Sequence, residues 1–117
     1  MELTKSEYRQ LSDIIRRGIL RRCEEWLKET KELIEKEYDG EENAFDRCMK
    51  VTKRSKDYFK EAMSREEYYR KSMMPIGIGQ LLLEGYITMD DLKELRPEVQ
   101  AAARRWAGID DQCNAQS

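Results

Sequence analysis

The chain has 117 residues, 39% of them charged, with nearly balanced signs and a net charge of −2. This length suits a single domain, and only six glycines and two prolines interrupt it, which argues against long disordered segments. The near-neutral charge excludes a general attraction to nucleic acid, and the longest near-apolar run, residues 73–83, is too short to cross a membrane. We therefore expect one soluble, cytoplasmic domain over residues 1–110, with no membrane segment.

The first predicted element is a long amphipathic helix over residues 4–38. Thr4 and Glu7 have the spacing in which each side chain satisfies the other's free backbone N–H, and Gly40 suits the left-handed conformation that follows a helix end. The apolar side chains cover an arc of roughly 180°, whereas a helix packed on one neighbour needs an arc only a little over ~100° wide. We expect this helix to pack against two surfaces.

A second helix of similar length is predicted over residues 42–73, because the apolar side chains keep one helical phase throughout. Ser64 and Glu67 also have capping-box spacing, so a break at Ser64 is the alternative interpretation. The unchanged phase favours one continuous helix. Two such helices joined near Gly40 predict a long antiparallel hairpin.

The charges of the two helices support this pairing. Residues 24–37 contain six acids and three lysines, whereas residues 43–56 contain five basic residues and one acid. Folding the chain at Gly40 sets residue i near residue 80 − i, so the two segments face each other. Exposed ion pairs contribute only about a few tenths of a kcal/mol each, so this pattern selects the register of the hairpin more than it stabilises it.

The third part is a compact tail over residues 76–107, separated from the hairpin by a hinge. Pro75 disfavours a helical conformation at Met74, and the two glycines that follow, Gly77 and Gly79, loosen the chain further. We therefore expect the long helices to end here and the tail to begin as a separate unit.

The tail is predicted to contain two to three short helices. The first spans residues 78–84, the next is capped by Thr88 with Asp91 at its third position, and the last spans residues 97–107 and begins with a proline. Residues 108–117 have no periodicity, and we expect them to be frayed.

The predicted fold class is therefore all-α, a long antiparallel helical hairpin followed by a compact tail of short helices. The last helix has a small apolar side apart from Trp106, so it needs a preformed surface to lie on. Two surfaces compete to cover the part of the first helix's apolar arc that the second helix leaves exposed. One is the chain's own tail, and the other is a second copy or a foreign partner.

The sequence offers little for catalysis. It has no histidine, which removes the commonest general base and the commonest metal ligand. Gly77 and Gly79 begin a phosphate-loop pattern, but Leu82 stands where its third glycine belongs. The cysteines lack a metal-binding spacing, and we expect reduced thiols; they are Cys23, Cys48 and Cys113. We expect no catalytic residue, no cofactor and no metal, and hence no enzyme.

Nucleic-acid binding is the main alternative function. Arg16, Arg17, Arg21 and Arg22 place four guanidinium groups within two helical turns, which suits phosphate contact. Pairing of these arginines with glutamates of the second helix is the competing interpretation, and we favour it. The tail also has helix-turn-helix spacing, but its second helix begins with two aspartates at the place where phosphates would be met.

Protein contact is the favoured function class. Five residues cluster around the hinge and the tail: Tyr68, Tyr69, Met73, Met74 and Trp106. Methionine and aromatic side chains suit adaptable binding surfaces, so this cluster is a candidate partner contact. Packing between hairpin and tail explains the same cluster, and we favour that interpretation.

We therefore expect a non-enzymatic protein–protein interaction or scaffolding module. Pairing two hairpins into a four-helix arrangement would cover the remaining apolar arc, so the expected partner is a second copy in a homodimer, or another helical protein. Nucleic-acid binding through the arginine cluster is the alternative and is not favoured. The sequence indicates no pathway.

Overall fold

The computed structural model describes residues 1–109, and within them the chain is helical without any strand. The α-helices are α1 (Lys5–Glu35), α2 (Ala44–Arg65), α3 (Met74–Glu84) and α4 (Pro97–Trp106), and the 3₁₀ helices are η1 (Glu66–Tyr69) and η2 (Met89–Leu92). The predicted all-α fold is confirmed. Most of the segment expected to be frayed, residues 110–117 with Cys113, lies outside the described residues.

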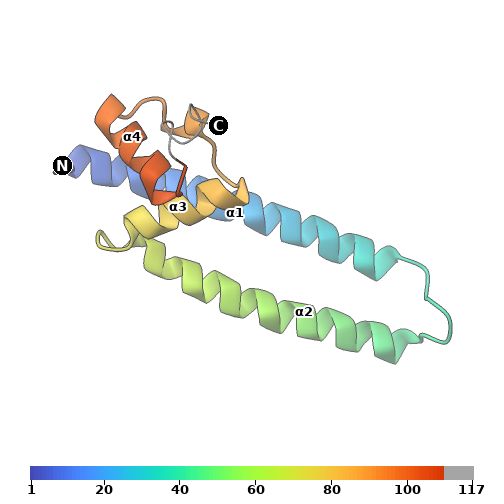
Figure 1. The fold of residues 1–117 in the computed structure, drawn as a ribbon. Helices are drawn as coiled ribbons and strands as arrows, with labels where there is room; N and C mark the ends of the chain where they lie inside the picture. Colours follow the sequence, from blue (N-terminus) through green and yellow to red (C-terminus); the bar gives the residue numbers. More distant parts are fainter. Residues whose placement is uncertain (110–117) are drawn as a thin grey trace.

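Two long antiparallel helices give the molecule an elongated shape of 57 × 36 × 19 Å. In Figure 1, α1 and α2 run alongside each other from the turn that joins them, while α3 and α4 gather against the N-terminal half of α1. We call residues 20–63 the arm, and the rest of the described chain the compact end. The predicted hairpin and its compact helical tail are confirmed.

The buried hydrophobic core lies in the compact end. Its side chains come from the first half of α1 and from the tail, and the largest fully buried ones are Leu11, Ile15, Ile78, Leu81, Ile87, Leu92 and Val99. Within residues 1–109 the arm contributes no buried hydrophobic residue. α1 therefore packs on two surfaces, as expected, but at different levels: the chain's own tail covers its first half, and α2 faces its second half.

The turn between the long helices is longer than expected. α1 ends at Glu35 instead of Tyr38, and α2 begins at Ala44, capped by the side chain of Asn43. Gly40 has a φ of +54°, a left-handed conformation that glycine adopts easily. It lies within the turn, however, and does not directly follow the end of α1.

The expectation of one continuous helix over residues 42–73 is wrong, because α2 ends at Arg65. The 3₁₀ helix η1 follows, and a turn through residues 70–73 then reverses the chain into α3. The alternative break near Ser64 is closer to the structure, although no side chain caps the start of η1. Periodicity extended the predicted helix too far, because the tyrosines of η1 continue its apolar pattern. They pack on the compact end, however, and not along the hairpin.

The expected hinge at Gly77 and Gly79 is also wrong, because both glycines are buried inside α3. Pro75 lies in the first turn of this helix, where its missing N–H costs nothing. A Cβ atom on Gly77 would come within 2.6 Å of the Tyr68 ring, and one on Gly79 would collide with the carbonyl group of Trp106. The glycines therefore allow α3 to pack closely against η1 and α4.

The remainder of the tail follows the predicted order of elements. Thr88 and Asp91 form the predicted cap, but a single 3₁₀ turn follows in place of a helix. This turn is too short to serve as the recognition helix of a helix-turn-helix motif. α4 begins with Pro97 as expected, and Gly108, with a φ of +75°, closes its C-terminal end.

The substitution Gly79→Ala tests the close packing of α3 on α4. On an exposed helix this change would stabilise the fold by roughly 0.5–1 kcal/mol, because glycine weakens helices. Here the new Cβ must displace the backbone of α4, so we expect the free energy of unfolding in denaturant to fall by about 1–3 kcal/mol. The exposed neighbour Gln80→Ala is the control and should leave stability nearly unchanged. Equal responses of the two variants would contradict the close approach.

An ion pair ties the start of α1 to the start of α4. Arg96 Nε donates to Glu7 Oε2 at 2.6 Å, and the N–H of Thr4 donates to the other oxygen of the same carboxylate at 2.8 Å. These contacts, with the bond from Arg96 as the larger cause, hold the pKa of Glu7 at about 2. The N-terminal turn of the molecule is therefore fixed to the tail by a carboxylate that must be ionised.

Acid should weaken this link. Because the pKa of Glu7 is depressed from 4.5, its ionised form stabilises the fold fully above about pH 4.5, and this contribution is lost as the pH falls toward about 2. In Glu7→Gln, which keeps a capping-box residue, the decline of the melting temperature across that range should be smaller than in the wild type. Glu94 is exposed, and in Glu94→Gln the melting temperature should decline as in the wild type. An equal decline in Glu7→Gln would contradict the role of the Glu7 carboxylate.

Candidate interaction surface

The described chain has no cluster of metal-ligating side chains and no helix suited to span a membrane. Among residues 1–109, His, Cys, Asp and Glu side chains do not gather in the groups of three or more that hold a metal ion. In the same part of the chain, every helix is too short or too polar to span a bilayer. Cys23 and Cys48 are free thiols, the first half-buried and the second exposed. The distinctive feature of the molecule is instead its arm.

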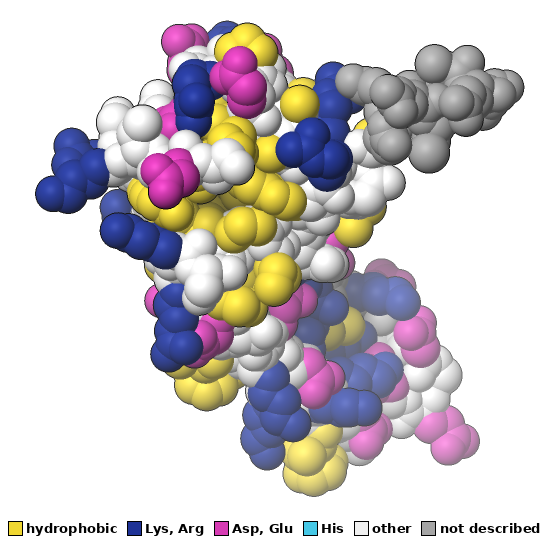
Figure 2. Space-filling model, turned by 60° about the vertical axis from the view of Figure 1, so that its left-hand side comes forward, with side chains coloured by type: hydrophobic (Ala, Val, Ile, Leu, Met, Phe, Trp, Pro, Cys, Tyr) yellow, Lys and Arg dark blue, Asp and Glu magenta, His cyan; other side chains and the backbone are white. Residues whose placement is uncertain are grey.

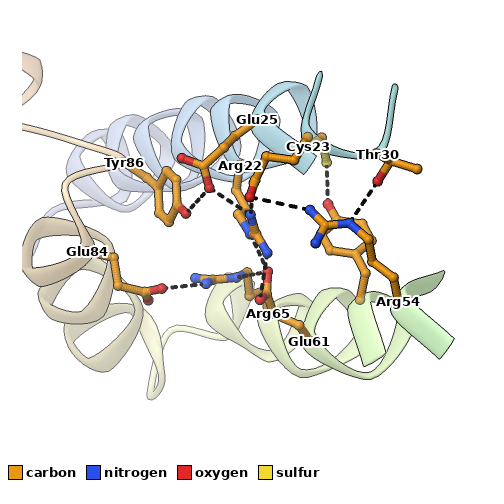
Figure 3. A network of polar contacts seen from close by, with 11 residues as sticks. Arg22, Cys23, Glu25, Thr30, Arg54, Glu61, Arg65, Glu84 and Tyr86 are labelled. Atoms are coloured by element: carbon orange, nitrogen blue, oxygen red, sulfur yellow. Dashed lines mark hydrogen bonds and ion pairs between the residues drawn. The ribbon is translucent and has the colours of Figure 1, made fainter. Parts of the chain in front are cut away.

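At the base of the arm, arginines join three helices. Arg22 of α1 donates to Glu61 of α2 at 2.8 Å and to Glu25 of its own helix at 2.7 Å. Arg65 of α2 is buried and donates to Glu84 of α3 at 2.9 Å. Figure 3 shows these groups as one polar network between α1, α2 and α3. The network raises the pKa of Arg22, chiefly through the hydrogen bond to Glu61.

In the middle of the arm, aromatic rings and an arginine fill the space between the helices. Trp26 of α1 stacks on Tyr58 of α2 with ring centroids 4.7 Å apart. The guanidinium of Arg54 lies 5.9 Å from the centroid of the Trp26 ring and donates to the Thr30 hydroxyl at 3.0 Å. Tyr58 donates its O–H to Cys23 Sγ at 2.9 Å, and burial together with this bond raises the pKa of Tyr58 to about 12.

At the tip of the arm, one buried arginine closes the hairpin. Arg47 of α2 donates to the carbonyl oxygens of Leu33 and Lys36, each at 2.6 Å, and to the Glu42 carboxylate at 2.8 Å. α1 has no basic residue in its last turn, so Arg47 supplies the donors and the positive charge that free helix carbonyls favour. Arg47 also donates to the Leu33 carbonyl oxygen, which would accept a backbone N–H if the helix continued. This competition explains why α1 ends at Glu35.

Charge pairs and aromatic stacking therefore hold the hairpin, and within the arm no aliphatic side chain is buried. The expected register is confirmed to within a few residues, because Arg22 meets Glu61 and Cys23 meets Tyr58. The expected pairing of acidic α1 with basic α2 also holds in the middle of the arm, where Arg54 lies 3.4 Å from a carboxylate oxygen of α1.

The arginine cluster proposed for phosphate contact is divided between two sides of α1. Arg21 forms hydrogen bonds of 2.8 and 3.0 Å with Asp91 of η2, and Arg17 lies 3.6 Å from the same carboxylate. The bond from Arg21 is the main cause that lowers the pKa of Asp91 to about 2. Arg22 faces α2, and Arg16 is exposed. Of the four arginines, only Arg22 forms the ion pair expected with the second helix.

The residues proposed for partner contact lie around the core. Met74 is buried within it, and Tyr68, Tyr69 and Trp106 pack against it with part of each side chain still accessible. Met73 is half-buried. The favoured interpretation, packing between hairpin and tail, is confirmed for the four that contact the core. A role of these residues in binding a partner stays a prediction.

A set of exposed apolar side chains lines the arm. Leu20, Leu27 and Ile34 of α1 are spaced seven residues apart, and Phe59 and Met63 lie on successive turns of α2. Each of the five exposes more than half of its surface to solvent. We call these five residues the apolar face.

Helix geometry places these side chains on the same side of the hairpin. Trp26 and Tyr58 stack between the helices, and Leu27 and Phe59 directly follow them in the sequence. A step of one residue turns about 100° around an α-helix. Because α1 and α2 run in opposite directions, the same step leads to the same side of the arm on both helices. The apolar face is therefore an aligned strip and not a scatter of single residues.

The sequence indicated only part of this face. Leu20, Leu27 and Ile34 belong to the wide apolar arc of the first helix. The single apolar phase expected over residues 42–73 does not distinguish Phe59 from the side chains that face α1. The usable signal is the pair of adjacent large apolar residues, as in Tyr58-Phe59. Two neighbours about 100° apart cannot both face one partner helix.

Known proteins give no further guide. The chain matches no protein-family model, and comparisons with curated proteins and with solved structures likewise find no match. The function has to be inferred from the arm and its apolar face.

Replacing Arg47 tests how the tip is closed. In Arg47→Ala the carbonyl oxygens of Leu33 and Lys36 lose the donor that Arg47 supplies, so we expect amide hydrogen exchange in residues 33–46 to become roughly tenfold faster or more. Exchange in the compact end should change little. Lys53→Ala, an exposed basic residue on the same helix, is the control. Unchanged protection at the tip of the Arg47 variant would contradict this role.

Proposed function

We propose that this protein is a non-enzymatic interaction module that pairs with a second copy of itself through the apolar face of its arm. The observation that carries the proposal is the alignment of five exposed apolar side chains on an element without a hydrophobic core of its own. Single exposed hydrophobic residues are ordinary on protein surfaces, but an aligned group on a projecting element is typical of an interaction site.

The spacing of the apolar face favours a helical partner. Leu20, Leu27 and Ile34 recur at the seven-residue interval that produces the seam of packed helices. A two-fold axis would bring the same strip of two copies together, and two hairpins would then form a four-helix arrangement. This pairing removes from water the apolar area that a single copy exposes, which supplies the driving force.

Nucleic-acid binding is supported less well. Arg17, Arg21 and Arg22 already lie within ion-pair distance of carboxylates, and breaking those pairs would offset the gain from phosphate contact. The same proposal includes a cytoplasmic location and no enzymatic activity. It rests on the scarcity of candidate catalytic residues in the sequence and on the arm.

The substitution Leu27→Asp places a carboxylate in the middle of the apolar face. We expect the dissociation constant of the dimer, measured by sedimentation equilibrium, to rise at least ~100-fold, because pairing would bury an unpartnered charge. Leu83→Asp is a matched control, since Leu83 and Leu27 each expose 61% of their surface but Leu83 lies on α3, outside the arm. It should pair like the wild type.

Two results would overturn the proposal. One is a wild-type chain that remains monomeric at concentrations of about 50 μM, where a useful self-association should be evident. The other is an equal loss of pairing in the Leu27 and Leu83 variants, because the effect would then not depend on the arm.

A further inference from the structure

The tip of the arm is acidic. Residues 35–42 contain five acids and one lysine. Two of the acids form ion pairs within the tip, Asp39 with Lys36 and Glu42 with Arg47. The other three are Glu35, Glu37 and Glu41, which are exposed and form no ion pair within the described part of the chain.

The tip also carries two large exposed apolar side chains. Phe45 exposes 70% of its surface and Tyr38 exposes 54%. Neither belongs to the apolar face, and the Tyr38 ring is held in place by the guanidinium of Arg47, 5.0 Å from its centroid. The tip therefore combines aromatic rings with unpaired carboxylates.

The opposite end of the molecule has a hollow of complementary character. It has a volume of about 650 Å³ and is formed by the N-terminal residues, the start of α3 and the side of α4. Its apolar lining includes Leu3, Tyr8, Pro75, Ala102 and Trp106. Figure 2, which brings the compact end forward, shows hydrophobic side chains gathered there with charged side chains of both signs around them.

Two basic side chains and one acidic side chain, Glu2, line this hollow. Lys71 and Arg105 are both exposed, and neither forms an ion pair within residues 1–109. Lys71 Nζ lies 4.9 Å from the centroid of the Tyr8 ring, which holds the charge beside the apolar lining. Trp106 supplies a second aromatic side chain, of the kind that anchors many protein contacts.

We infer that this hollow binds the arm tip of another copy of the chain. Phe45 and Tyr38 would enter the apolar part, and Glu37 and Glu41 would meet Lys71 and Arg105. The contact cannot form within one chain, because the tip and the hollow lie at opposite ends of a molecule 57 Å long (Figure 1).

This contact goes beyond the proposed function and differs from it in kind. Pairing of the apolar faces joins like surfaces and ends at two copies, whereas a tip in a hollow joins unlike surfaces and leaves a free tip and a free hollow at the ends of the assembly. Such head-to-tail association adds further copies as the concentration rises. It also depends on exposed charges, so salt weakens it.

The test uses the full chain carrying Leu27→Asp, which removes pairing through the apolar face. In sedimentation velocity at about 20 mM salt, the average mass should rise with concentration, and about 500 mM salt should abolish the rise. Adding Lys71→Glu with Arg105→Glu should also abolish it. The control reverses two other exposed lysines of the arm, Lys53→Glu with Lys60→Glu, and should keep the rise.

A mixture of two charge-reversed variants tests the contact between tip and hollow most directly. A Leu27→Asp chain that also carries Glu37→Lys and Glu41→Lys should not associate alone. It should associate with the Leu27→Asp chain that carries the reversed hollow, because each tip then meets a hollow of opposite charge. Failure of the mixture to regain mass, or a mass that does not rise at low salt in the Leu27→Asp chain, would overturn the inference. The proposed function is tested separately, by comparing the dissociation constant of the dimer between the wild type and Leu27→Asp at ordinary salt.

Discussion

The arm of this protein depends on arginines that take the place of a hydrophobic core. Arg22 at the base, Arg54 in the middle and Arg47 at the tip each reach from one long helix to the other. A buried arginine is tolerated when carboxylates and carbonyls satisfy its donors, and it becomes costly when they do not. These long side chains, with the stacked rings of Trp26 and Tyr58, fill much of the hairpin, and Leu20, Leu27 and Ile34 stay exposed.

The compact end and the arm are therefore stabilised by different interactions. In the compact end, helices approach closely enough that Gly77 and Gly79 face aromatic and backbone atoms directly, and aliphatic side chains are fully buried. In the arm, the helices are joined by ion pairs and ring contacts, with much of their surface in water. Local opening should start in the arm, because it has few buried apolar contacts. Pairing through the apolar face would supply the burial that the arm lacks.

The sequence was sufficient where a local rule governs the structure. The capping pairs of Thr4 and Thr88, the antiparallel hairpin and its register follow from spacing and charge, and all are present. The end of α2 and the role of Gly77 were missed for one reason. Periodicity tells which side of a helix is apolar, but it does not tell which neighbour covers that side. The tyrosines of η1 keep the helical phase while they pack on a different partner.

The candidate surface was predictable to a similar degree. The wide apolar arc of the first helix indicated that some of its residues face something other than α2, and the structure divides that arc between the tail, α2 and solvent. The arginine cluster could not be resolved from spacing alone, because Asp91, which binds Arg17 and Arg21, lies on a distant part of the chain.

The central claim is that the apolar face contacts a second copy, and the most direct measurement is a search for contacts between chains in solution. A mixture of ¹³C-labelled and unlabelled protein allows intermolecular nuclear Overhauser effects from methyl groups to be separated from those within one chain. The account predicts such effects from the methyl groups of Leu20 and Leu27, and none from the buried Leu11. Self-association without any intermolecular effect at Leu20 and Leu27 would contradict it.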